Sequence, residues 1–76
     1  MYKNITIEDI QIRIDYVNEL CNTHLALEHY TNNNYPYRLI NQDMQYVLRA
    51  GSKREVYLYL IGVLEGINTY KAAHNI

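Results

Sequence analysis

The chain has 76 residues, 49% of them apolar, and a formal net charge of -1 at pH 7. This length allows one domain, over residues 1–76, and a chain of this size buries only about 60% of its unfolded surface. The apolar content excludes a disordered tail, and the near-zero charge excludes a polyelectrolyte that coats nucleic acid. With nine Tyr and no Phe or Trp, we expect several aromatic rings to lie half in the core and half at a contact surface.

The chain carries none of the usual signals for export or membrane insertion. Its only cysteine, Cys21, cannot form an internal disulfide, which suits a reducing cytoplasm. The start lacks the pattern of a signal peptide, and no apolar run approaches the roughly 18 residues of a membrane span. We therefore expect a soluble cytoplasmic protein without a membrane partner.

The first predicted element is an amphipathic helix over residues about 6–21. Thr6 and Asp9 have the spacing of a capping box, in which each side chain binds the backbone amide of the other residue. Apolar residues then recur at steps of three and four: Ile7, Ile10, Ile14, Val17, Leu20 and Cys21. This spacing predicts one core-facing side, with Cys21 as a small core residue.

The periodicity changes from 3.6 to 2 after residue 23, which predicts three strands over residues about 24–30, 35–41 and 44–49. Asn32, Asn33 and Asn34 suit the first turn, because Asn tolerates the left-handed backbone conformation. Pro36 cannot donate to a strand ladder, so the start of the second strand lies at an edge or outside the pairing. Short connections favour an antiparallel meander.

A second helix is predicted over residues about 52–70. Gly51 allows the chain to turn, and Ser52 with Glu55 forms another capping box. Its apolar face consists of Val56, Leu60, Val63, Leu64 and Ile67. The fold class is therefore α+β, with two helices packed on one face of a three-stranded antiparallel sheet in the order α-β-β-β-α.

Apolar and small residues also occupy the outer side of this second helix. Leu58, Ile61 and Gly62 lie outside the core-facing arc, and Gly62 and Gly66 each cost about 1 kcal/mol of helix stability relative to Ala. Soluble monomers rarely leave such a surface open, so we expect a homo-oligomer paired through Leu58, Ile61 and Gly62. The alternative contacts are the far face of the sheet or an edge strand.

Four of the seven basic residues fall in the second and third strands or at the start of the last helix: Arg38, Arg49, Lys53 and Arg54. A helix N-terminus presents free amides, so a phosphate or carboxylate can bind there. Ser52, Tyr35, Tyr37 and Tyr57 complete the candidate ligand site, where a ring stacks on a base. In the competing interpretation Lys53 and Arg54 are solvated, and Arg38 pairs with Glu28 or Asp43.

Metal binding and catalysis are not expected. Cys21, His24 and His29 supply too few ligands for a metal site, and the two histidines have opposite parity on a strand. No serine or cysteine has a histidine and an acid at a recognisable spacing, and no glycine-rich phosphate loop is present. We expect no enzyme activity, no cofactor and no metal.

Three segments resemble a group of very small, largely uncharacterised bacteriophage and prophage proteins: IQIRIDYVNEL at 10–20, YPYRLI at 35–40 and SKREVYLYLIGVLEGI at 52–67. Members share a helix with a "VEYLN" core, a strand ending in "YRL", and a last helix that begins "KRELY" and ends "GI". This chain departs from the group at Tyr35 and Pro36, where two glycines are common. The resemblance implies phage origin and a compact fold.

A weaker likeness is to the double-stranded-RNA-binding domain, which has the same element order and a last helix that begins with a Ser-Lys-Lys type sequence. Ser52, Lys53 and Arg54 match that opening, but Tyr57 stands where a further lysine is expected.

These features lead to two functional hypotheses. In the first, the chain is a phage accessory protein of counter-defence in the cytoplasm of an infected bacterium, which sequesters a nucleotide-like host signal or inhibits a host protein. In the second, it is a nucleic-acid-binding module that uses the helix start at Ser52, Lys53 and Arg54.

Overall fold

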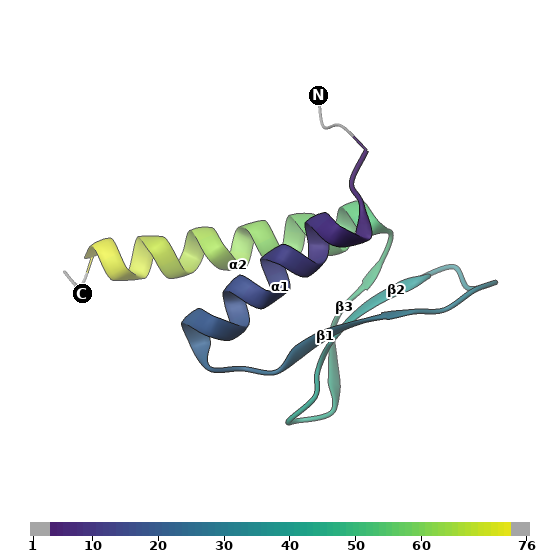
Figure 1. Cartoon of the computed structure of the whole chain (residues 1–76), viewed down its shortest axis with the longest axis horizontal. Helices are drawn as coiled ribbons and strands as arrows, with labels where there is room; N and C mark the ends of the chain where they lie inside the picture. Colours follow the sequence, from purple (N-terminus) through teal and green to yellow (C-terminus); the bar gives the residue numbers. More distant parts are fainter. Residues whose placement is uncertain (1–3, 74–76) are drawn as a thin grey trace.

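The computed structural model describes residues 4–73, and its elements follow the order α-β-β-β-α. They are α1 (Ile7–Cys21), β1 (Leu25–His29), β2 (Tyr37–Asn41), β3 (Tyr46–Gly51) and α2 (Lys53–Ala73). The strands form one antiparallel sheet in the order β1-β2-β3. Both helices lie on the same side of this sheet (Figure 1), so the predicted α+β fold is confirmed.

Both predicted capping boxes are present. At the start of α1, the Thr6 amide donates to Asp9 Oδ2 at 2.9 Å, and the Asp9 amide donates to Thr6 Oγ1 at 3.1 Å. At the start of α2, the Ser52 amide donates to Glu55 Oε1 at 3.0 Å, and the Glu55 amide donates to Ser52 Oγ at 3.1 Å. Local hydrogen bonds of this kind satisfy amides that have no partner within a helix.

The core lies between the two helices and the centre of the sheet. Leu39 of β2 is fully buried, and it packs with buried residues of both helices and of β1: Ile10, Ile14, Val17, Leu25, Val56 and Leu60. The expectation that Cys21 is a core residue is wrong, because its side chain is exposed. Cys21 is the last residue of α1 and follows the last buried position, Val17, by one turn.

Alternation along β1 and β2 assigns side chains to two faces. Leu25 and Leu39 face the helices and are buried, and Leu27 packs against the same core. The face without helices, which we call the open face, consists of the alternate residues of β1 and β2 and their cross-strand partners in β3. These residues are Ala26, Glu28, Arg38, Ile40, Val47 and Ala50.

The strand ends differ slightly from the predicted ones. The third strand begins at Tyr46 rather than at residue 44, because Gln45 has a positive φ of 54° within the turn. β2 begins at Tyr37, so Pro36 lies outside the strand. The ladder is irregular between Leu39 and Ile40, which pair with Arg49 and Val47 and leave Leu48 as the extra residue of a bulge.

Asn18 closes part of the free edge of β1. The Leu25 amide donates to Asn18 Oδ1 at 2.8 Å, and Asn18 Nδ2 donates to the Leu25 carbonyl at 3.1 Å. The side-chain amide thus binds both outward backbone groups of Leu25, as a neighbouring strand would. This contact joins α1 to the sheet and protects one end of an edge strand.

We predict opposite effects for alanine at two glycines. A Cβ on Gly51 would lie 2.8 Å from the Glu55 carboxyl group, whereas a Cβ on Gly66 would meet nothing within 4 Å. Gly51→Ala should displace that carboxylate and lower the free energy of unfolding by about 1 kcal/mol, the usual value of a helix cap. Gly66→Ala should raise it by about 1 kcal/mol through helix propensity. Urea unfolding measures both, and equal shifts for the two variants would contradict this role of Gly51.

Candidate functional site

The cations near the start of α2 are not all available to a ligand. Arg49 Nη2 lies 3.3 Å from Glu55 Oε2, so its guanidinium binds the same carboxylate that caps α2. Lys53 is half-buried and Arg54 is exposed in the first turn of the helix. Glu55 therefore places a negative charge among the residues that were expected to bind an anion.

Hydrogen bonding keeps the Glu55 carboxylate ionised. Its pKa is lowered from the ordinary value of 4.5, first by the hydrogen bond from the Ser52 backbone, then by the Ser52 side chain and more weakly by Arg49. Both groups stabilise the charged form. The carboxylate consequently belongs to the helix cap and reduces the positive potential of the helix start.

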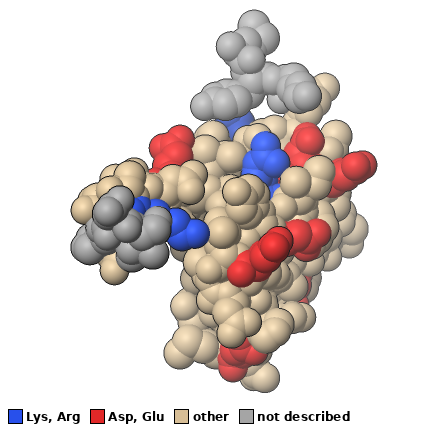
Figure 2. Space-filling view, turned by 60° about the vertical axis from the view of Figure 1, so that its left-hand side comes forward, with Lys and Arg blue, Asp and Glu red and all other residues tan. Residues whose placement is uncertain are grey.

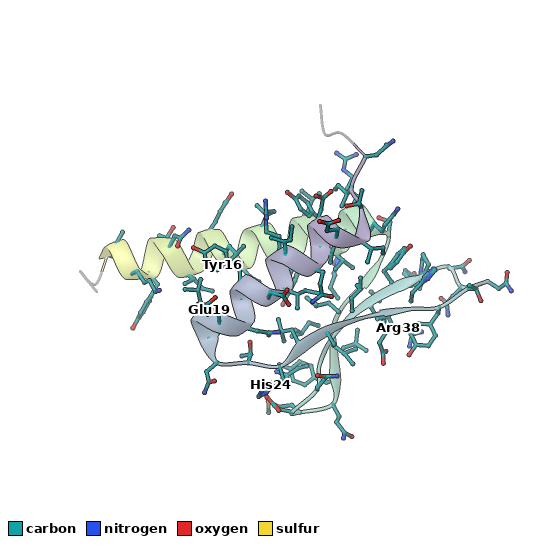
Figure 3. The ribbon with its side chains drawn as sticks, in the orientation of Figure 1. Tyr16, Glu19, His24 and Arg38 are labelled. Carbon is teal, nitrogen blue, oxygen red and sulfur yellow. The ribbon has the colours of Figure 1, made fainter. Side chains whose placement is uncertain are left out.

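Arg38 lies on the other side of the sheet. It follows the open-face parity, and Figure 3 shows its label on the side of the strands that faces away from the helices. Its guanidinium carbon is 4.5 Å from the centre of the Tyr30 ring, a cation–π contact. The Tyr30 hydroxyl donates to Glu28 Oε1 at 2.7 Å, and this hydrogen bond is the main cause of a raised Tyr30 pKa.

The competing interpretation, in which Arg38 pairs with Glu28 or Asp43, is not borne out among residues 4–73. Glu28 is its cross-strand partner, but the contact that the structure gives Arg38 is with the Tyr30 ring. Asp43 instead lies 2.9 Å from His24 Nδ1, at the opposite end of the sheet.

The three tyrosines proposed to stack on a ligand occupy three different environments. Tyr35 is exposed in the β1–β2 loop, where its amide donates to Asn33 Oδ1. Tyr37 stacks on His29 with ring centres 4.5 Å apart. Tyr57 packs against the core, and the Arg13 guanidinium carbon lies 5.8 Å from its ring centre. No common stacking platform joins these three rings.

The predicted ligand residues therefore divide between two sides of the sheet. Arg49, Ser52, Lys53, Arg54 and Tyr57 gather at or near the start of α2, whereas Arg38 lies on the open face and Tyr35 in the hairpin loop. In Figure 2, blue and red atoms are interspersed on the face shown, and most of that face is uncharged. A concentrated basic surface is not visible there.

A feature that was not predicted is a shallow hollow of ≈ 440 Å³ on the open face, the open-face hollow. Its lining residues are Glu28, Ile40, Gln42, Gln45, Tyr46 and Val47. Val47 of this lining is 47% exposed, and the neighbouring turn residue Met44 is 70% exposed. The sequence did contain a signal: two helices on one face of a sheet leave Ile40 and Val47 on the other face.

Residues 4–73 contain neither a cluster of metal-ligating side chains nor a helix suited to span a membrane. Within this range, no three His, Cys, Asp or Glu side chains gather closely enough to hold a metal ion. Neither described helix combines the length and apolar character needed to cross a membrane.

Comparisons with protein-family models, curated proteins and solved structures find no match to this chain.

The Glu55 cap predicts a specific acid sensitivity. Because the folded-state pKa lies below the ordinary value of 4.5, the cap stabilises the protein above that pH and its contribution is lost as the pH falls through the folded-state pKa. Thermal unfolding between pH 6 and pH 2 should show a steeper loss of stability for wild type than for Glu55→Gln. Glu65→Gln, on the exposed side of α2, should behave as wild type. Parallel curves for wild type and Glu55→Gln would refute the assignment.

Proposed function

We propose that this chain is a small phage accessory protein of counter-defence that acts by binding and inhibiting a host protein. The observation that carries the proposal is the exposed apolar surface formed by Val47 on the open face and Met44 in the adjoining turn. Large exposed apolar patches on small soluble proteins typically serve protein contacts. The phage origin rests on the sequence resemblance described above.

Sequestering a nucleotide-like signal has weaker geometric support. Such a ligand needs cations that converge on its phosphates, but Arg49 binds Glu55 and Arg38 lies across the sheet. The same division weakens the alternative of a nucleic-acid-binding module at Ser52, Lys53 and Arg54. That module would need several basic residues on one surface.

The host-protein hypothesis predicts which variants abolish binding. Immobilised chain incubated with bacterial lysate should retain a host protein, and Val47→Asp should reduce the retained amount at least tenfold. Val47→Thr keeps the shape of the side chain and is the matched control. Lys53→Ala combined with Arg54→Ala should leave retention unchanged.

The opposite pattern would overturn the proposal. One contrary result would be a thermal shift with cyclic or linear nucleotides, or a salt-sensitive gel shift with duplex RNA. If the Lys53→Ala, Arg54→Ala variant lost that binding, the function would belong to the cation cluster instead. Retention of no host protein would also contradict it.

We also propose that the chain forms a homo-oligomer through the outer side of α2. Leu58 is 37% exposed, Ile61 is half-buried, and a Cβ on Gly62 would meet nothing within 4 Å. The open side of Gly62 leaves room for the backbone of a second helix. Such an approach would compensate for the low helix propensity of glycine.

Light scattering at micromolar concentration should then give a multiple of the 9.0 kDa chain mass. Leu58→Glu should shift the mass toward that of one chain, because it places a charge in the contact. Ile12→Glu changes an apolar residue of α1 that is 49% exposed, and it should leave the mass unchanged. A wild-type mass of one chain over a hundredfold range of concentration would exclude this assembly.

A further inference from the structure

The open-face hollow is lined by apolar and polar residues. Ile40 and Val47, which are direct cross-strand partners, supply aliphatic surface. Tyr46 also contributes to the lining. Glu28, Gln42 and Gln45 supply a carboxylate and two side-chain amides. The lining therefore offers hydrogen-bond acceptors, one negative charge and aliphatic surface.

Most of these polar groups can form further hydrogen bonds. Glu28 Oε1 accepts the Tyr30 hydroxyl at 2.7 Å, while the structure gives Glu28 Oε2 no partner among residues 4–73. Within the same described range, the side-chain amides of Gln42 and Gln45 also have no hydrogen bond within the chain. An occupant could bind these groups without displacing a contact within the chain.

The chemistry of the lining selects among occupants. A phosphate or carboxylate would meet the Glu28 carboxylate, and none of the lining residues is a cation. A metal ion would find a single carboxylate, which is too few charged ligands. A purely apolar side chain would cover the carboxylate without replacing its hydration, which is unfavourable.

A long basic side chain satisfies each part of the lining. Its methylene groups can lie on Ile40 and Val47, as such stems commonly cover apolar surface. Its head can donate to Glu28 Oε2 and to the amide oxygens. Arginine suits the site better than lysine because its planar guanidinium binds carboxylates with two hydrogen bonds and is less strongly hydrated.

We propose that the open-face hollow is the docking site for an arginine side chain presented by a protein partner. This inference rests on the proposed function and specifies where the partner binds and which residue it contributes. The exposed turn residue Met44, which directly precedes the lining residue Gln45 in the chain, would contact an apolar group that flanks the arginine.

Arg38 allows a test in which a cationic ligand and an anionic ligand give opposite results. It is the cross-strand partner of Glu28, and its guanidinium is held over the Tyr30 ring. Its positive charge therefore opposes a second cation at Glu28. Removing this charge should strengthen the binding of arginine, whereas it would weaken the binding of any anion.

The test is an NMR titration of the full chain with N-acetyl-arginine amide. Saturable shifts of the Ile40 and Val47 signals are expected at millimolar concentrations. N-acetyl-citrulline amide has the same shape without the charge, and it should bind roughly threefold more weakly, as expected for a partly exposed ion pair. Glu28→Gln should remove this difference, and Arg38→Gln should tighten arginine binding about threefold.

Glu19→Gln on α1, away from the hollow, is the matched control and should change neither titration (Figure 3). Dispersed amide spectra identify variants that remain folded. Three results would each overturn the proposal. The first is equal binding of the arginine and citrulline amides, and the second is a stronger shift with N-acetyl-leucine amide or inorganic phosphate. The third is weaker arginine binding by Arg38→Gln. Because the probes are amino-acid amides, failure to retain a host protein would contradict the proposed function without affecting this result.

Discussion

One-sided coverage of the sheet is the constraint on which the rest of this structure depends. Leu39, at the centre of the middle strand, is fully buried between residues of both helices. Each fully buried aliphatic side chain contributes about 1.5–3 kcal/mol, so the small core needs every one of them. With both helices on that face, Ile40 on the same strand must turn toward solvent or toward a partner.

The Glu55 carboxylate connects this packing to the candidate chemistry. It caps α2, binds Arg49 and occupies the space that a side chain at residue 51 would take. The contacts that fix the direction of the second helix therefore also use one of the four clustered cations. Stability and anion binding compete for the same residues at this end of the molecule. The open face has no such competition, because its Glu28 carboxylate has one oxygen without a partner among residues 4–73.

Local patterns predicted the elements well. Both capping boxes depend on residues three positions apart, and the change from helical to alternating periodicity marks the end of α1 correctly. What these patterns could not show was the width of the core, which leaves Cys21 and much of Ile7 exposed. Nor could they show the role of Asn18, whose side chain binds the backbone of β1.

The candidate site was harder to predict because it depends on long-range geometry. The four cations are close in the chain, yet strand parity sends Arg38 to the face opposite the helices and Arg49 to Glu55. Conversely, the open-face hollow joins Glu28 of β1 to residues of β2, the following turn and β3. Only the pairing register, with its bulge at Leu48, brings these side chains together.

The accessibility of adjacent side chains in β2 tests this account most directly. NMR relaxation by a soluble paramagnetic reagent, measured on methyl groups of dilute protein, compares Leu39 and Ile40 within one strand and adds Val47 across the ladder. The structure predicts strong relaxation of the Ile40 and Val47 methyl groups and protection of those of Leu39. Equal protection of all three would mean that both faces of the sheet are covered, and it would contradict an open face available to a partner.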